Sequence, residues 1–301
     1  MRKFSVYLKN NYQLYLFLLP AVVYLVIFQY GPLYGVQIAF RDYSPKLGIL
    51  GSPWVGFAHF RTFFQSYYFK ELLVNTLALS GMILLFGFPL PIILALLLNQ
   101  FPGKRYRKII QTVTYAPYFI STVVICGMLY VFLSPSTGLV NHIIGIFGGK
   151  PINFMGEPKY FRGMYVVSEI WQMTGWNAII YLAALSGVDP QLHEAAVMDG
   201  AGKLQRIVHI DIPGILPQAM ILLILNVGNI MNIGFEKVFL LQNDVNAATS
   251  EIISTYVYKM GIEQAQHSFA SAVGLFNSVI NMTLLLIINS VSKRLTESSL
   301  W

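Results

Sequence analysis

Long apolar runs dominate this sequence of 301 residues, of which 55% are hydrophobic and only 11% are charged. Most of the runs approach the roughly 20 residues that an α-helix needs to cross about 30 Å of hydrocarbon. Backbone N–H and C=O groups find no water in lipid, so only helices and closed barrels span a membrane. These runs lack the alternation that marks barrel strands. The sequence therefore predicts an all-α membrane protein with six transmembrane helices, over residues 14–39, 72–98, 109–133, 161–185, 219–234 and 269–291.

The basic residues predict how these spans are oriented. Lys and Arg number 20 against 13 Asp and Glu, which gives a net charge of +7. Lys104, Arg105, Arg107 and Lys108 crowd into the short loop between the second and third spans, and such clusters stay on the cytoplasmic side. Six spans then place both termini in the cytoplasm, with the chain in a bacterial cytoplasmic membrane. Because the orientation of the spans explains the excess of basic residues, we expect membrane lipids and no nucleic acid as partners.

The N-terminal segment differs from the rest of the chain. Residues 1–13 alternate charged positions with apolar and aromatic ones, which favours a short interfacial helix. The apolar run that follows is too long for the core of a cleaved signal peptide. We therefore expect it to be retained as the first span of a transmembrane domain over residues 14–301. The single cysteine, Cys126, precludes an internal disulfide.

The connection between the fourth and fifth spans, residues 187–217, is far longer than most links between helices. Asp189 is suited to cap a helix in which Pro190 takes the first position. We predict that helix over residues 191–199. Gly200 then supplies a break, helped by a second glycine two residues later, because glycine enters left-handed conformations at little cost.

A second short helix is predicted over residues 203–212, and Pro213 and Pro217 are expected to close the loop before the fifth span. The result is an elbow of two helices joined by glycine on the cytoplasmic face. Glu194 and Asp199 project from it beside small alanines, which suits insertion into a groove on another protein. A plain amphipathic connector is the alternative interpretation.

This loop resembles the EAA loop of importer permeases in the ATP-binding-cassette superfamily. Its residues read Glu194-Ala195-Ala196-x-x-Asp199-Gly200-Ala201, and nine residues after Gly200 comes Ile210-Asp211-Ile212-Pro213. The family has Leu where this chain has Ile212. The resemblance implies a type I importer permease fold with a cytoplasmic coupling loop, whose first helix sits in a cleft of an ATPase. By this resemblance Glu194 pairs with a basic residue of the ATPase, and the coupling residues are Glu194, Ala195, Ala196, Asp199, Gly200 and Ala201.

Looser motifs along the chain resemble the carbohydrate-uptake (MalF-like) permeases, and within them the LplB-like group. They are Phe28-x-Tyr30-Gly31-Pro32, Phe40-x-Asp42-Tyr43, Trp54-Val55-Gly56-Phe57, Gly234-Phe235-Glu236 and Leu300-Trp301. This resemblance implies a subunit that forms half of a translocation pathway for an oligosaccharide or a complex polysaccharide fragment. The implied partners are a second homologous permease, two copies of a cytoplasmic ATPase and an extracellular lipid-anchored solute-binding protein.

No phosphate-binding loop of the Gly-x-x-x-x-Gly-Lys-Ser/Thr type occurs in the sequence. We therefore expect no cofactor in this chain and no enzymatic activity, with ATP and Mg²⁺ held by the partner ATPases. The alternative is an ATP-independent secondary transporter or channel for a small polar solute. Such transporters usually carry ionisable residues deep in their spans. Glu169 is the nearest case here, so an external energy source is favoured.

Two sets of residues are candidates for lining the substrate path. Asn226, Asn229 and Asn232 are spaced three apart in the fifth span, which would place them along one helix face. Hydrogen bonding between helices is the equally weighted alternative. Trp171 and Trp176 in the fourth span match, by their distance from the EAA motif, the place of sugar-contacting aromatic residues in the maltose-type relative. Anchoring at the outer membrane interface is the alternative for these two tryptophans.

Overall fold

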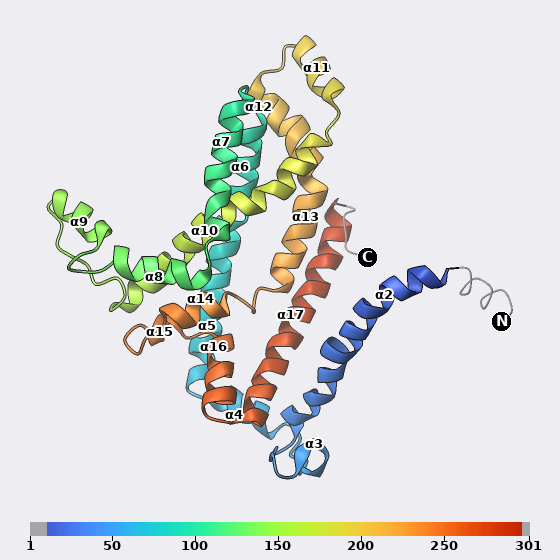
Figure 1. Cartoon of the computed structure of the whole chain (residues 1–301), viewed down its shortest axis with the longest axis vertical. Coiled ribbons are helices and arrows are strands. Elements are labelled where there is room, and N and C mark those ends of the chain that lie inside the picture. Colours follow the sequence, from blue (N-terminus) through green and yellow to red (C-terminus); the bar gives the residue numbers. More distant parts are fainter. Residues whose placement is uncertain (1–10, 297–301) are drawn as a thin grey trace. The chain divides into compact units, whose positions relative to one another are not determined.

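The computed structural model of the chain describes residues 11–296, with side chains through residue 294. Across that range the regular elements are helices, and one isolated bridge pairs Arg41 with Trp54. The predicted interfacial helix over residues 1–13 falls almost wholly outside the described residues. In chain order (Figure 1) the elements are α2 Tyr12–Leu25, η1 Val26–Tyr30, η2 Gly31–Phe40, α3 Gly48–Gly51, α4 Ala58–Gln65, α5 Tyr68–Met82, η3 Ile83–Gly87, α6 Pro89–Asn99, α7 Lys104–Tyr115, η4 Ala116–Phe119, α8 Thr122–Phe132, α9 Leu139–Ile146, α10 Pro158–Ser186, α11 Pro190–Met198, α12 Lys203–Arg206, η5 Ile207–Asp211, α13 Ile212–Gly228, α14 Phe235–Leu241, α15 Ala247–Ser250, α16 Ile253–Tyr258, η6 Lys259–Glu263 and α17 His267–Thr296.

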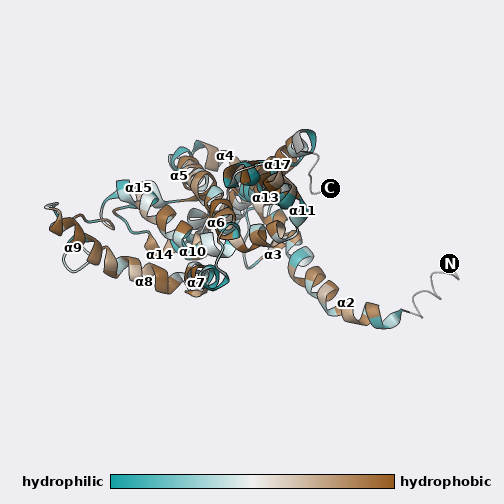
Figure 2. Cartoon of the chain, turned by 90° about the horizontal axis from the view of Figure 1, so that it is seen from above, coloured by the Kyte–Doolittle hydropathy of each residue, from teal (hydrophilic) through white to brown (hydrophobic). Residues whose placement is uncertain are grey.

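Four helical segments of the described chain are long and apolar enough to cross a membrane. They match the first, second, fifth and sixth predicted spans, and they run Tyr12–Phe40, Tyr68–Asn99, Lys203–Gly228 and His267–Arg294. The side chains of α2 are exposed throughout, Phe17 being 85% exposed. Figure 2 colours much of α2 and α8 as hydrophobic. Exposed apolar helices of this length are typical of contact with lipid.

The third predicted span is not one straight helix, which corrects the sequence-based expectation. Lys104–Phe119 and Thr122–Phe132 are helical, but they meet at an angle of 97°. Ile120 is extended (φ −81°, ψ 127°), and the Ser121 hydroxyl accepts a hydrogen bond from Val124 N at 3.4 Å, which caps α8. Pro117 and a serine in the N-cap position are the local signals of this break.

Three π-helical turns each end two residues before a proline. Proline has no N–H, and its ring clashes with the carbonyl four residues earlier. In each case that carbonyl belongs to the widened turn, so the π-helical geometry makes room for the ring and the helix continues. The three pairs are η1 with Pro32, η3 with Pro89, and η5 with Pro213.

The fifth predicted span is longer at one end and shorter at the other than expected. Pro213 and Pro217 do not close the preceding loop, because η5 widens ahead of Pro213 and Pro217 lies inside α13. The segment Lys203–Gly228 is therefore continuous, and the predicted second loop helix is its first part. The helix then stops at Gly228, whereas the sequence predicted helix to residue 234.

The described chain divides into two compact units. The first comprises residues 11–66 and 257–276, where the Phe40 ring stacks on Trp54 at 5.6 Å and Arg41 donates to the carbonyl of Ser52 at 2.8 Å. The second comprises residues 67–256 and 277–296, and it contains every predicted site residue.

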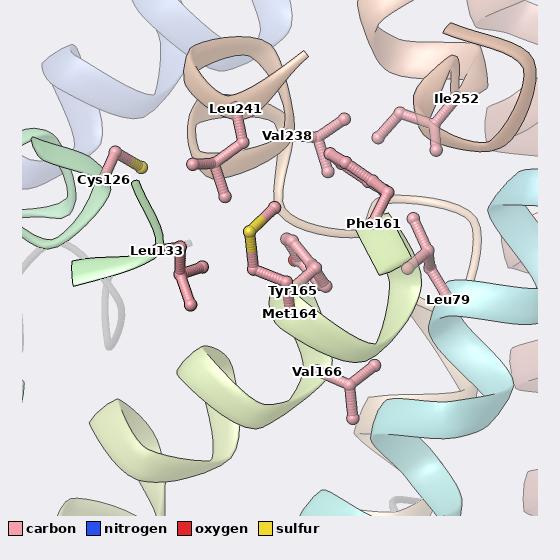
Figure 3. Close-up of a cluster of buried hydrophobic side chains, with 10 residues drawn as sticks. All are labelled: Leu79, Cys126, Leu133, Phe161, Met164, Tyr165, Val166, Val238, Leu241 and Ile252. Atoms are coloured by element: carbon pink, nitrogen blue, oxygen red, sulfur yellow. The ribbon is translucent and has the colours of Figure 1, made fainter. Parts of the chain in front are cut away.

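Helix α10 is the centre of the second unit. It packs on α6, α7 and α13, and its 29 residues include eleven that are buried. One apolar core joins it to α5, α8 and α14, around Phe161 and Tyr165 (Figure 3). A second core joins it to α6 and α13 around Tyr181. It is not one of the four segments above, because polar and ionisable side chains occur among its apolar ones.

Candidate functional site

The loop between α10 and α13 begins with a well-formed short helix. Asp189 caps α11, its Oδ1 accepting a hydrogen bond from Gln191 N at 2.9 Å, and Pro190 takes the first helical position as predicted. At the other end Ala201 N donates to Ala196 O at 2.8 Å and Gly200 N donates to Val197 O at 3.0 Å. This pair of bonds is a Schellman motif, which requires a left-handed residue. Gly200 supplies it with φ +79°.

The helix α11 stands clear of the rest of its unit. None of its described side chains is buried, and Figure 1 shows it beyond the ends of α6 and α7. Glu194 is exposed and enters no ion pair with the described residues. Leu192 and Met198 are also exposed, Met198 by 87%. A short helix that presents a free carboxylate among exposed apolar side chains has the composition of a contact surface.

One side chain of α11 makes a contact within its unit that the sequence did not indicate. The Nε2 atom of His193 lies 3.3 Å from Oδ1 of Asp211, a residue with 0% exposure. His209, the other histidine of the loop, is exposed, and its Nδ1 lies 2.9 Å from the carbonyl oxygen of Gln205 in its own helical turn.

A cavity of about 410 Å³ lies in the second unit between the α5–α6 segment, α10 and α13. Apolar side chains make up much of its wall, and a minority of polar groups converge on it. Thr174 Oγ1 is buried and has no hydrogen-bond partner among the described residues. The polar residues of the wall are Ser80, Glu169, Thr174, Asn177, Tyr181, Asn226, Asn229 and Asn232. Apolar pockets with a few convergent polar groups are typical of small-molecule binding.

The three predicted asparagines all line this cavity, although they do not form a stripe on one helix. Asn226 lies in the last turn of α13, whereas Asn229 and Asn232 follow the end of that helix at Gly228. The Asn232 Oδ1 accepts a hydrogen bond from Asn277 of α17 at 2.6 Å, and Asn229 donates to Leu225 O at 3.1 Å. The irregular backbone thus turns both amides toward the cavity while satisfying part of their hydrogen bonding.

The two predicted tryptophans lie elsewhere on α10. Trp176 stacks on Tyr118 with ring centroids 4.0 Å apart and planes within 1° of parallel. Trp171 borders a separate, mainly apolar cavity between α8 and α10. Neither lines the polar cavity, although both remain partly exposed, at 48% for Trp171 and 38% for Trp176.

One buried ionisable group beside the cavity, Lys237, was missed by sequence reasoning, and it pairs with Glu169, which the sequence had singled out. Lys237 of α14 places its Nζ 2.5 Å from Oε2 of Glu169 and 2.8 Å from Oε1 of Gln172. The Lys237 side chain is 4% exposed and that of Glu169 is 21% exposed. Lys237 lies in α14, outside the six predicted spans, so it does not contradict the expectation that few ionisable residues lie deep in them. The spacing of Glu169 and Gln172 on one helix face was the available signal, but nothing local pointed to Lys237.

Residues 87–297 match the protein family described as the binding-protein-dependent transport system inner membrane component. That match covers α6, α10, α11, α13 and most of the residues that line the polar cavity. The chain belongs to this family.

Relatives of this permease share most of its length. It is 45% identical to Protein LplB of Bacillus subtilis (strain 168) over 98% of this chain and 92% of that protein. It is 44% identical to the polygalacturonan/rhamnogalacturonan transport system permease protein YteP of the same organism, over 96% of this chain and 90% of that protein. The predicted family and the predicted transport role, in place of an enzymatic one, are confirmed.

A solved structure extends the comparison to the fold. The permease superposes on a chain of a bacterial ABC transporter involved in import of the acidic polysaccharide alginate, with a TM-score of 0.91 and 41% identity over 98% of this chain and 100% of that one. A second structure of the alginate transporter, in complex with an alginate pentasaccharide-bound periplasmic protein, matches equally well, with 41% identity over 97% of this chain and 98% of that one. The type I importer permease fold is thereby confirmed.

Proposed function

We propose that this permease forms half of the translocation pathway of an ATP-driven importer for oligosaccharides or complex polysaccharide fragments. Its partners would be a second homologous permease, two copies of a cytoplasmic ATPase that hold ATP and Mg²⁺, and a lipid-anchored solute-binding protein outside the cell. The substrates named for two of its relatives are polygalacturonan/rhamnogalacturonan and the acidic polysaccharide alginate, which supports a cargo that contains uronic acids.

The observation that carries this proposal is the exposed helix α11. Its outward face offers Glu194 beside the small side chains of Ala195 and Ala196, and the Schellman motif at Gly200 holds its far end in a fixed shape. We assign this helix, with Asp199 and Ala201, to a cleft of the ATPase. Closure of the ATPases would move it through contacts that differ between the two states.

The same geometry supports a cytoplasmic location for this loop and for both termini. Gln100, at the end of α6, donates to Asp211 at 2.8 Å, so the end of α6 and the base of the loop are neighbours. The basic cluster Lys104–Lys108 begins four residues later, at the start of α7. Basic clusters stay on the cytoplasmic side. Six spans follow if α7–α8 is one broken span and α10 is counted as another.

We propose that the polar cavity lines part of the substrate path. Asn226, Asn229 and Asn232 offer amide groups suited to sugar hydroxyls, and the unpartnered Thr174 hydroxyl adds another. Trp171 and Trp176 are assigned to a different stretch of the path, where their partly exposed rings would lie against sugar faces. This division assigns hydrogen bonding and stacking to separate surfaces.

Replacing Glu194 by Ala tests the coupling role. We expect Glu194→Ala to abolish uptake and stimulation of ATP hydrolysis by the binding protein, with unchanged membrane insertion, because an exposed side chain contributes little to folding. His209→Ala, an exposed change in the same loop, is the matched control and should behave as the wild type. Normal stimulation in Glu194→Ala would contradict the proposal.

The cargo is tested by purifying the whole complex with its binding protein. Mass spectrometry of the glycan retained by the binding protein should find an oligosaccharide with uronic acid units. Recovery of a monosaccharide or an amino acid would overturn the substrate class while leaving the coupling role standing.

A further inference from the structure

The carboxylate of Asp211 joins three separate elements at the base of the loop. Asp211 ends η5, just before α13, and has 0% exposure. Its Oδ2 accepts a hydrogen bond from Gln100 Nε2 at 2.8 Å, and its Oδ1 accepts one from Asn99 Nδ2 at 3.3 Å. The ring of His193, on α11, approaches the same Oδ1 at 3.3 Å. One side chain thus connects the end of α6, the helix α11 and the start of α13.

A buried carboxylate is stable only when its oxygens are satisfied by donors. Here all three donors come from outside the helix that carries the aspartate, and they belong to two different elements. A shift of either element relative to α13 removes a donor from a group that water cannot reach. The arrangement therefore resists relative motion of the three elements.

The His193 contact has particular weight because α11 has little else to hold it. None of the described side chains of α11 is buried. Among the hydrogen bonds and ion pairs of the described residues, His193 provides the one side-chain link from α11 to another element. Without it, α11 would stay attached to α10 and α13 mainly through its two connecting turns.

We infer that Asp211 is a positioning residue that makes α11 and the end of α6 move together with α13. This inference rests on the proposed coupling role of α11. Motion imposed on α11 by an ATPase would then reach two spans at once, α13 through the chain and α6 through Asn99 and Gln100. If the cytoplasmic ends of α6 and α13 move together, a small displacement of the loop would change the shape of the pathway wall.

The test measures a distance in the assembled importer. With the buried Cys126 replaced by Ser, spin labels are placed at two exposed positions, Gln191 on α11 and Phe101 just after α6. Pulsed electron paramagnetic resonance is recorded without nucleotide and after trapping with Mg-ATP and vanadate. In the parent protein we expect one narrow distance distribution that is the same in both states.

The variants distinguish a positioning role of this contact from a merely structural one. Asp211→Ala and His193→Ala should broaden the distribution and shift it on trapping, with about a tenfold loss of ATPase stimulation by the binding protein. His193→Gln keeps an N–H donor and should restore the narrow distribution. His209→Ala is the matched control and should leave it unchanged. Because His193 is only partly buried, its replacement tests the idea even if Asp211→Ala fails to fold.

Two results would overturn the inference or its premise, and they are distinct. Narrow, nucleotide-independent distances in His193→Ala would show that the carboxylate does not hold α11. Normal ATPase stimulation in Glu194→Ala, measured beside these variants, would instead remove the coupling role while leaving the distance result intact.

Discussion

The buried pair of Lys237 and Glu169 gives a quantitative test of how α14 is held against α10. The Lys237 ammonium is 2.5 Å from Glu169 and 2.8 Å from Gln172, and its side chain is 4% exposed. Removing one partner of a buried ion pair costs about 3–5 kcal/mol, whereas replacing both by neutral groups is often close to neutral. Because Glu169 keeps some access to the cavity, we place Lys237→Met near the lower limit, at about 3 kcal/mol.

Replacing the partner residue, Glu169, should lower the free energy of unfolding by less. In Glu169→Gln the ammonium retains Gln172 as an acceptor, and the new amide oxygen remains within reach. We expect a loss of about 2 kcal/mol for this variant. The double variant Lys237→Met/Glu169→Gln should be about as stable as Glu169→Gln alone, because no charge is then left unpaired. The resulting coupling energy is about 3 kcal/mol.

The assay is unfolding in mixed detergent micelles, with increasing sodium dodecyl sulfate and tryptophan fluorescence as the readout. Lys159→Met is the matched control, since Lys159 also contacts a carboxylate, Glu157 at 2.7 Å, but at the surface. Exposed pairs contribute little, so its unfolding curve should coincide with that of the wild type. Additive losses in the double variant would refute the reasoning, because independent groups show no coupling.

Three further predictions concern packing and backbone geometry. A Cβ on Gly175 of α10 would meet the carbonyl of Thr114, so Gly175→Ala should lower the free energy of unfolding by about 2 kcal/mol through overpacking. Gly163 lies on the same helix with open space around it, so Gly163→Ala should leave the free energy of unfolding unchanged. The same micelle assay distinguishes the two variants. Gly200→Ala should lose about 1–2 kcal/mol of loop stability at φ +79°, seen as faster amide exchange in α11. Asn141→Ala removes donors to three carbonyls and should release the loop after α9, measured as faster proteolysis there.

The sequence predicted the elements that depend on the types of neighbouring residues. The apolar runs located four long helices, and Asp189, Pro190 and Gly200 located α11 and its end. These predictions succeed because capping and left-handed turns depend on neighbouring residues. The prediction at Pro213 was wrong for a local reason too: proline usually ends a helix, but here a π-helical turn lets the helix continue through it.

The contacts that assemble the site could not be predicted in the same way. Lys237 and Glu169 are 68 positions apart, and Asp211 and Gln100 are 111 apart. Hydropathy predicts that burying each of these residues costs free energy. The actual free-energy cost depends on which hydrogen-bond donor or acceptor the fold brings near, and the sequence does not show that. The asparagines that the sequence selected all line the polar cavity, even though the helix thought to align them ends at Gly228.

The widened turn ahead of Pro213 has a mechanical consequence. Because the helix is not broken there, Asp211 and Asn226 lie on one rod, about 22 Å apart along its axis at 1.5 Å per residue. A tilt of about 5° around the point midway between them displaces the two residues by about 1 Å each in opposite directions. A flexible joint at the proline would absorb that displacement. Because the helix is stiff at the proline, a movement of Asp211 also moves Asn226, and the wall of the polar cavity then changes shape.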